Sequence, residues 1–387
     1  MKIRIQLNNL SVIKTKNMEE LQRNIYEWSR SRCVVIPFGS CRLCGDLPTS
    51  DVDFVCLTNL TRDLLFDTLP NFLESIGCIQ LIVLRTIYVP VIKFRYRDKD
   101  YDLIFACVSL SHIDPSISLI QIMNHVVSQE DLRSLQALYT TEYILKYIEG
   151  RNHEFSMLLR QIKNWCLDQG IYSNALGLLN GVTLAIMCAY IIRTYSSECN
   201  HFHKFFDVFS NWNWENDVVT IYHGNHASIK KGYMNVYTPF EKPLNTMYNT
   251  SFQQYLQIMS RFKNYASSGG TTNFFEKECY YISFQLVSQN HTKHYLHQSY
   301  IESKLKLLSV LFPENPFEYH TTCYEISTCR SVFYIKLRIK PDEQFIRYLH
   351  EQFIMKISTI EDFTEKCITT KIIDYSKLPS FVVLNDS

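Results

Sequence analysis

Apolar and polar positions repeat with two different periods along the chain. Residues 18–31 have apolar positions at helical spacing, and the β-branched run CVVIPFGS that follows predicts a buried strand ending in a loop at Gly39. DVDFVCL alternates like a second strand, and residues 61–77 return to helical spacing and end at Gly77. Residues 79–108 predict two or three more strands, with a turn at residues 97–100.

The second half of the chain changes from helical to mixed spacing. The pattern is mainly helical from Ile120 to about Arg193, and strands and helices alternate from Phe274 onward. A Ser/Gly/Thr-rich segment at residues 267–272 predicts a linker. The longest apolar run, ALGLLNGVTLAIMCAYII, is near membrane-spanning length, but it contains Asn180 and Thr183, which favours a buried helix. These patterns predict an α+β multidomain protein.

Composition indicates the kind of chain and its compartment, and says less about the function. The 387 residues are 46% apolar and 20% charged, which is typical of a folded globular chain. The formal net charge is +1, so any basic surface that binds nucleic acid must be local. Thirteen cysteines have no framework spacing and no signal peptide is visible, so we expect an intracellular, reducing compartment.

The stretch from Gly39 to Asp53 carries the strongest chemical signal. Gly39 lets backbone approach a phosphate closely, and the Ser40 hydroxyl can bond phosphate oxygens. Asp51 and Asp53 lie two apart on a strand and face the same side, where two carboxylates require a cation between them. Asp102, on a later alternating strand, is the candidate third ligand. Three carboxylates predict a site for two Mg²⁺ ions, for which Mn²⁺ can substitute.

Each of these signals has a simpler alternative. An isolated D-x-D, or an aspartate near the 97–100 turn, is more often a solvated side chain, but the ordered occurrence of Gly-Ser, D-x-D and a strand aspartate favours the metal site. Cys41 and Cys44 form a C-x-x-C, yet no second pair supplies four zinc ligands and no thioredoxin-like context is present. We therefore interpret these cysteines as packing residues.

Several longer blocks carry a family resemblance. FGSCRLCGDLPTSDVD, VPVIKFRYRDKDYDLIFA, GIYSNALGLLNGV and FFDVFSNWNW occur in this order, and the chain resembles the nuclear-type eukaryotic poly(A) polymerases of the polymerase β-like nucleotidyltransferase superfamily. The resemblance implies a polymerase β-like catalytic domain, a helical middle domain and a C-terminal RNA-recognition-like α/β domain. The boundaries we expect are an N-terminal segment 1–33 packed on the middle domain, then domains at 34–119, 120–266 and 267–387.

The resemblance also implies an activity and residue roles. It implies template-independent transfer of AMP from ATP to the 3′-hydroxyl of RNA, with release of pyrophosphate. The catalytic metal ligands would be Asp51, Asp53 and Asp102. The residues expected around the nucleotide are Phe38, Gly39, Ser40, Lys163, Tyr172, Asn174, Gly181 and Val182. Without the resemblance, Lys163 would be interpreted as a solvated helix lysine and Tyr172 as a core tyrosine.

RNA binding is expected in the C-terminal part. KHYLHQSYIESKLKLLSVLF and FYIKLRIK mix basic and aromatic residues, a combination that suits single-stranded RNA but is equally typical of a solvated amphipathic face. The candidate RNA contacts are Lys304, Lys306, Lys336 and Arg338.

Two other functions remain open at this point. A terminal uridylyltransferase would share the carboxylates, and an inactive nucleotidyltransferase fold would serve as an RNA-binding or processivity subunit. Besides ATP and an RNA 3′ end, we expect processivity or 3′-end-processing protein partners and no membrane. The family implies the nucleus, while the absence of its long basic tail leaves the cytoplasm open.

Overall fold

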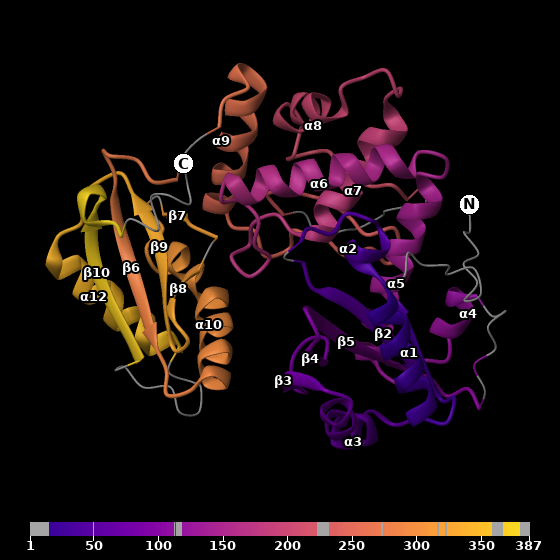
Figure 1. Cartoon of the computed structure of the whole chain (residues 1–387). Helices are drawn as coiled ribbons and strands as arrows, with labels where there is room; N and C mark the ends of the chain where they lie inside the picture. The colour runs from indigo at the N-terminus through magenta and orange to yellow at the C-terminus, as the bar shows by residue number, and fades with distance from the viewer. Residues whose placement is uncertain are drawn as a thin grey trace.

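The chain folds into three parts that follow one another in sequence (Figure 1). The computed structural model describes residues 15–48, 50–111, 113, 118–222, 232–271, 274–315, 317–321, 323–357 and 367–379. A five-stranded mixed sheet comes first, a group of helices follows, and a second, antiparallel sheet ends the chain. This is the multidomain α+β architecture predicted from the sequence.

The first sheet has the strand order β1-β2-β5-β4-β3. β2 and β5 are parallel, and the other neighbouring pairs are antiparallel. The elements of this part are α1 (Lys16–Trp28), β1 (Cys33–Pro37), α2 (Gly39–Arg42), β2 (Val52–Thr58), α3 (Arg62–Ser75), β3 (Cys78–Leu84), β4 (Val91–Tyr96) and β5 (Lys99–Cys107).

α1 and α3 form within a few residues of the helices that the sequence predicts, whereas the single turn α2 was not predicted. Thr61 caps α3 by accepting a hydrogen bond from the backbone of Leu64, and Gly77 follows its end with φ +92°. Met18, Leu21 and Ile25 form the buried face of α1, and they join the core of the first sheet. Our expectation that the N-terminal segment packs on the middle domain is therefore wrong for its described part. The apolar face of α1 packs against the first sheet instead.

Six helices make up the middle part: α4 (Leu119–Met123), α5 (Gln129–Tyr147), α6 (Asn152–Asp168), α7 (Gly181–Thr194), α8 (His201–Ser210) and α9 (Phe252–Ser268). Two predicted boundaries differ from those observed. The apolar run at residues 175–192 is helical only from Gly181, because Asn180 caps the helix there through the backbone N–H of Thr183. α9 continues to Ser268, so the predicted linker can begin only at Gly269, which has φ +64°.

The second sheet has the order β10-β6-β9-β7, with β8 also paired to β9. Its strands are β6 (Tyr280–Val287), β7 (Glu318–Tyr319), β8 (Tyr324–Ser327), β9 (Arg330–Leu337) and β10 (Ile368–Asp374). The helical elements are α10 (His291–Leu305), α11 (Leu307–Leu311), α12 (Glu343–Ile357) and the short 3₁₀ helix Tyr375–Lys377. Alternate residues of β6 serve opposite faces: Ile282 and Phe284 join a core with α10 and α12, and Tyr281 joins an aromatic cluster on the other face.

The middle and C-terminal parts meet at a polar contact that we call the α9–sheet contact, made by Gln257, Arg261, Glu318, Tyr319 and Lys336. Arg261 lies 2.9 Å from Glu318, and Lys336 lies 2.9 Å from the same carboxylate. Gln257 donates to the carbonyl of Tyr319 at 3.1 Å and accepts from its N–H at 3.3 Å. Because these groups are largely buried, the contact holds the second sheet at a defined place beside the helices.

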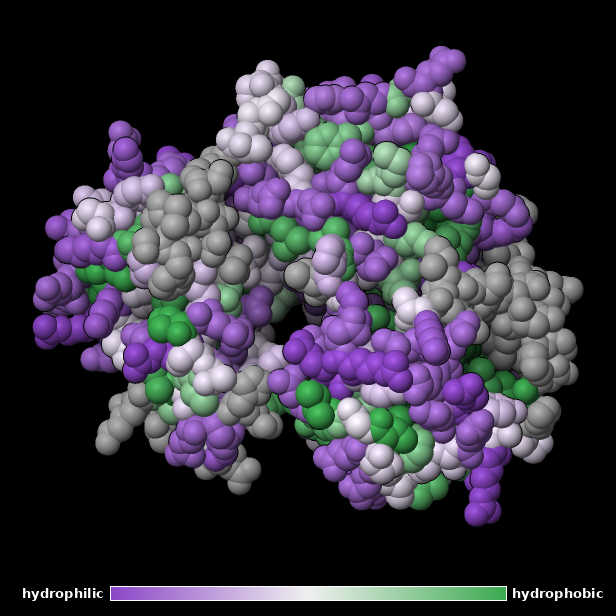
Figure 2. All heavy atoms as spheres, viewed as in Figure 1, coloured by the Kyte–Doolittle hydropathy of each residue, from purple (hydrophilic) through white to green (hydrophobic). Residues whose placement is uncertain are grey.

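A hollow remains between the C-terminal part and the first sheet, visible in the space-filling view (Figure 2). α10 lies on the C-terminal side of this hollow (Figure 1). In the part of the chain that the structure describes, no helix has both the length and the apolar character to cross a membrane.

Candidate active site

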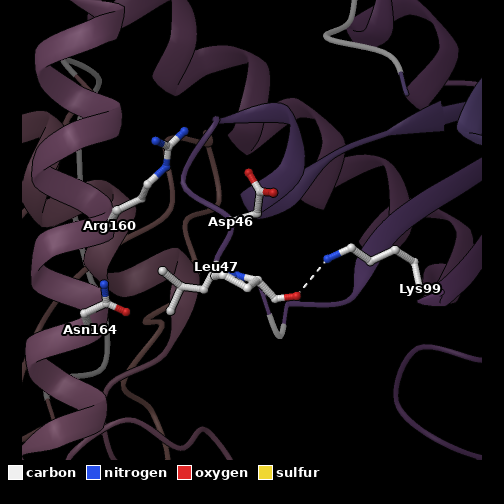
Figure 3. A pocket seen from close by; sticks show the side chains of 6 residues that line it. Asp46, Leu47, Lys99, Arg160 and Asn164 are labelled. Atoms are coloured by element: carbon white, nitrogen blue, oxygen red, sulfur yellow. Dashed lines mark hydrogen bonds between the residues drawn. The ribbon is translucent and has the colours of Figure 1, made fainter. Parts of the chain in front are cut away.

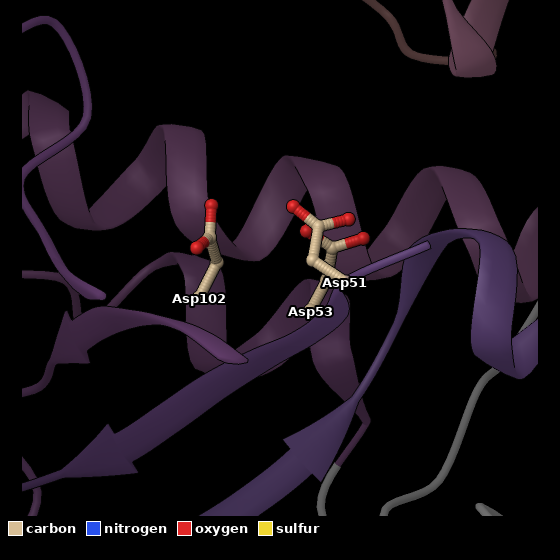
Figure 4. A group of neighbouring side chains, drawn as sticks. All are labelled: Asp51, Asp53 and Asp102. Atoms are coloured by element: carbon tan, nitrogen blue, oxygen red, sulfur yellow. The ribbon is translucent and has the colours of Figure 1, made fainter. Parts of the chain in front are cut away.

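Three aspartates meet near the start of two neighbouring strands. Asp51 directly precedes β2, Asp53 lies in β2, and Asp102 lies in β5. The parallel register of these strands pairs Asp53 with Asp102. One carboxylate oxygen from each of the three lies within 4.8 Å of the others (Figure 4). The structure thus brings together the three carboxylates that the sequence pattern selected.

The electrostatics of this cluster favour a bound cation. Burial, and then the charges of Asp51 and Asp102, raise the pKa of Asp53 to about 8. Burial also raises the pKa of Asp102, against the opposing effect of Lys93. A divalent ion would favour the ionised form of all three groups. Carboxylate oxygens are the ligands that Mg²⁺ and Mn²⁺ prefer, so the residues present fit such an ion.

Lys93 is a site residue that the sequence analysis missed. It lies in β4 directly opposite Asp102 in the antiparallel register, and its ammonium forms an ion pair with that carboxylate. Asp102 accordingly raises the pKa of Lys93, although burial opposes the rise. The alternation in VIKFRY places Lys93 and Arg95 on one face, but the sequence pattern could not show which strand lies beside them.

The turn before the cluster is shaped by a glycine. α2 is a single helical turn, where we expected an open loop, and it begins at Gly39 with φ +63°. A Cβ atom at this position would lie 2.5 Å from a carboxylate oxygen of Asp53, so no side chain fits there. The N–H of Phe38 donates to the carbonyl of Asp53 at 3.0 Å, which fixes the turn, and thus Ser40, beside β2.

Lys163 and Tyr172 approach the carboxylates from the middle part. Lys163, in α6, is only 4% exposed, and its ammonium donates to the carbonyl of Gly45 at 3.1 Å. The same ammonium lies 5.9 Å from the ring centroid of Tyr172. Burial lowers the pKa of Lys163, while Asp46, Asp51 and Asp53 raise it, so the lysine is in electrostatic reach of two cluster members. Burial raises the pKa of Tyr172 to about 12.

The remaining predicted nucleotide residues lie in the segment after Tyr172 and at the start of α7. Gly181 is the first residue of α7, not an interior residue as we expected, and a Cβ there would lie 3.2 Å from the Tyr172 hydroxyl. Val182 follows it and is 39% exposed. The side-chain oxygen of Asn174 accepts a hydrogen bond from Asn180 at 3.3 Å, which holds the loop between α6 and α7 against the cap of α7.

A pocket of about 430 Å³ lies between the loop that follows α2, β5 and α6 (Figure 3). Asp46 and Leu47 of this loop lie between Lys99 of β5 and Arg160 of α6. The Lys99 ammonium donates to the carbonyl of Pro48 at 2.8 Å. This bond, together with that from Lys163 of α6 to the carbonyl of Gly45, holds the loop between the sheet and α6.

The two cysteines near the site are thiols in environments that disfavour ionisation. Burial, and then the charge of Asp46, raise the pKa of Cys41 to about 11. Burial also raises the pKa of Cys44. Within the described residues, the only group suited to hold a metal is the aspartate cluster. These surroundings agree with a packing role for both cysteines.

The predicted RNA-contacting residues have different surroundings. Lys304 lies in α10 with its ammonium 5.1 Å from the ring centroid of Tyr300, and Lys306 follows α10. Arg338 is largely exposed. Lys336 corrects our expectation, because its side chain is 0% exposed and pairs with Glu276 at 2.8 Å as well as with Glu318. The positive charge of Lys336 is therefore balanced by carboxylates of the protein itself.

The sheet order and the aspartate cluster define the class of the protein, a polymerase β-like nucleotidyltransferase. A solved structure of the Cid1 poly(U) polymerase with Mg and 3′-dATP superposes with a TM-score of 0.51 at 16% identity, covering 66% of this chain and 87% of that chain. At this identity, the likeness concerns the fold alone.

The chain belongs to the poly(A) polymerase family. The model of the poly(A) polymerase nucleotidyltransferase domain matches residues 11–148, and that of the central domain matches residues 154–267, so the two cover more than half of the chain. The poly(A) polymerase of Dictyostelium discoideum is 30% identical over 306 residues, 71% of this chain and 38% of that protein. Nuclear poly(A) polymerase 2 of Arabidopsis thaliana is 28% identical over 251 residues, 59% of this chain and 31% of that protein. The chain thus spans about a third of the length of these relatives.

Proposed function

We propose that the protein is a poly(A) polymerase, which transfers AMP from ATP to the 3′-hydroxyl of RNA without a template and releases pyrophosphate. The observation that carries the proposal is the aspartate cluster facing Lys163 and Tyr172 across two parts of the chain, in a member of this family. A cluster of carboxylates with a buried lysine nearby suits a substrate that carries both metal ions and phosphate.

Each side of the site has a distinct task in this proposal. Asp51, Asp53 and Asp102 hold two divalent ions, which when bound would activate the acceptor hydroxyl and neutralise charge on the leaving pyrophosphate. Lys163 binds the triphosphate as a fixed positive charge, and its low exposure strengthens that attraction. The absence of a side chain at Gly39 leaves room for phosphate beside Asp53.

The remaining contacts orient the nucleotide. We assign Phe38 and Ser40 to the phosphate side, and Tyr172, Asn174, Gly181 and Val182 to the nucleoside side. Gly181 supports this assignment because it leaves space next to the Tyr172 hydroxyl.

The direct test is extension of a labelled oligo(A) primer by the 387-residue chain with Mg²⁺ and each nucleoside triphosphate in turn. We expect ladders with ATP, and at least a 100-fold slower rate for Asp102→Ala, since a two-metal site supplies several kcal/mol of transition-state stabilisation. Asp100→Ala is the matched control, because Asp100 lies in the same strand but pairs with exposed Arg95 at 2.7 Å. It is expected to retain activity.

The other outcomes of this assay distinguish the alternatives. Ladders with UTP in place of ATP would identify a terminal uridylyltransferase. A folded chain that extends no primer with Mg²⁺ or Mn²⁺ would support a role as an RNA-binding or processivity subunit.

We infer the biological setting from the relatives. Two Arabidopsis thaliana relatives are named as nuclear poly(A) polymerases, so we propose that the chain acts in the nucleus, together with processivity or 3′-end-processing partners. We also propose that residues 267–387 bind RNA, with Lys304, Lys306 and Arg338 as contacts. Microscopy of a tagged chain tests the location, and co-purification on that tag tests the partners.

A further inference from the structure

α10 connects the nucleotide-binding loop with the aspartate cluster. Tyr295 and Glu302 lie seven residues apart in this helix, so they project from the same face. Glu302 accepts a hydrogen bond from the hydroxyl of Ser173 at 2.9 Å, and Ser173 directly follows Tyr172. This bond fixes one end of the face against the middle part of the protein.

Tyr295 lies at the other end of this face, in a helix that is across the hollow from the first sheet (Figure 1). Its hydroxyl lies in electrostatic reach of Lys93, Asp102 and Asp51, which belong to the first part of the chain. Burial raises the pKa of this hydroxyl, so Tyr295 is neutral near pH 7. Its side chain is still 38% exposed, and the helix that carries it borders the hollow between the C-terminal part and the first sheet (Figures 1 and 2).

The order of residues across the sheet shows which substrate Tyr295 faces. Gly39 lies between β1 and β2, Asp53 lies in β2, Asp102 in β5 and Lys93 in β4, and these strands are successive neighbours. The phosphate turn is therefore at one end of this row, and Tyr295, near Lys93, is at the opposite end. In an in-line displacement the acceptor and the leaving group occupy opposite sides of the reacting phosphorus. Tyr295 accordingly lies on the acceptor side.

We infer that Tyr295 is a positioning residue for the acceptor, whose ring stacks on the 3′-terminal nucleotide of the RNA. The inference rests on the proposed function and adds a specific acceptor contact to it. Single-stranded RNA is commonly bound by stacking of unpaired bases on aromatic side chains, and the neutral hydroxyl can also donate to the terminal ribose. Lys304 does not share this face. It follows Tyr295 by nine residues, and this separation places the two side chains on opposite sides of the helix.

The test compares Tyr295→Ala and Tyr295→Phe with wild type in steady-state extension of oligo(A). Tyr295→Ala should raise the KM for RNA by about 5-fold to 100-fold, the range that corresponds to loss of one base–aromatic stack, and leave the KM for ATP unchanged. Tyr295→Phe keeps the ring and should stay close to wild type. Leu296→Ala is the matched control, because Leu296 is the next residue in α10 and is also 38% exposed.

The inference is overturned if Tyr295→Ala leaves the KM for RNA equal to that of Leu296→Ala, or raises the KM for ATP in step with it. If Tyr295→Ala does not fold, Tyr295→Leu removes the ring with less loss of volume and is judged by the same criteria. Fluorescence anisotropy of labelled oligo(A) without ATP separates this inference from the proposed function. Tyr295-dependent RNA binding without any AMP transfer would overturn the function alone, and AMP transfer with a Tyr295-independent KM would overturn this inference alone.

Discussion

Asp53 couples the stability of the metal-free chain to pH. Its carboxyl loses its proton above about pH 4 in the unfolded chain but only above about pH 8 in the fold. Between these values the folded state binds the extra proton, so the free energy of unfolding falls as pH rises. Thermal unfolding in EDTA from about pH 5 to 8.5 should show a steeper fall for wild type than for Asp53→Asn.

Mg²⁺ provides the second half of this experiment. Because a divalent ion favours the ionised carboxylates, added Mg²⁺ should stabilise wild type more at pH 8 than at pH 5. Equal pH slopes for wild type and Asp53→Asn in EDTA would contradict the burial and charge repulsion that we assign to Asp53.

Lys163 is predicted to act on ATP and not on RNA. Lys163→Met keeps much of the buried volume but removes the charge beside Gly45, so the KM for ATP should rise by about 10-fold to 100-fold, the equivalent of one hydrogen bond to a charged group. Lys204→Met is the control, because the ammonium of Lys204 in α8 lies 4.9 Å from the ring centroid of Tyr195, in a similar lysine–tyrosine pair. A rise in both KM values for Lys163→Met would argue for a structural role instead.

At the scale of single residues, the sequence predicted those site residues whose side chains are placed by the alternation along one strand. Asp51 and Asp53 share a face by the two-residue period, and Asp102 follows the same alternation. Lys93 was missed because a strand pairing places it opposite Asp102, and Tyr295 because its helix α10 is far from the aspartates in sequence. Lys336 looked like a surface cation, since its partners Glu276 and Glu318 lie far from it in sequence.

The junction between β1 and α2 depends on Gly39. Gly39→Ala places a side chain in a left-handed conformation, which costs about 1–2 kcal/mol, and also displaces the Asp53 carboxylate. We expect at least a 10-fold lower rate of primer extension, since Asp53, a proposed metal ligand, moves. Gly77→Ala, at φ +92° with no atom within 4 Å of the new Cβ, should lose stability but keep the wild-type rate. Equal rates for both variants would contradict the close approach at Gly39.

At the scale of elements, periodicity predicted most helices and strands. The errors arose at helix caps and at one helix too short to show a period. The run at residues 175–192 is mostly apolar, yet α7 begins only at Gly181, where the Asn180 side chain accepts a hydrogen bond from the backbone N–H of Thr183. α2 was missed because a single turn of four residues carries no period. α9 runs past Ser267 into the predicted linker and ends at Gly269, where the left-handed conformation suits glycine.

At the scale of the whole molecule, the order of the three parts was predictable but their mutual placement was not. The placement depends on buried polar groups far apart in sequence, such as Gln257 against Tyr319 and Ser173 against Glu302. Individually these residues look like surface residues, because their partners are set only by the folded arrangement. The same contacts set the position of α10 relative to the first sheet, so we expect acceptor binding to depend on the α9–sheet contact.

The variant Arg261→Met tests whether acceptor binding depends on the α9–sheet contact. Its side chain is 2% exposed and pairs with Glu318, which keeps Lys336 as a second partner, so Arg261→Met should cost about 1–3 kcal/mol and lower the melting temperature by several degrees. We also expect a higher KM for RNA with an unchanged KM for ATP, since the C-terminal part is held less firmly while Lys163 and Tyr172 stay in place.

The control for Arg261 is an ion pair that lies on the surface. Arg347 and Glu343 are 3.9 Å apart with side chains 80% and 89% exposed, so Arg347→Met should change the free energy of unfolding by less than about 1 kcal/mol and neither KM. An equal melting temperature for both variants, or a rise in the KM for ATP alone with Arg261→Met, would contradict the link between the α9–sheet contact and acceptor binding. A loss confined to RNA would mean that the fixed position of the C-terminal part supplies acceptor affinity, because this contact lies away from the aspartate cluster.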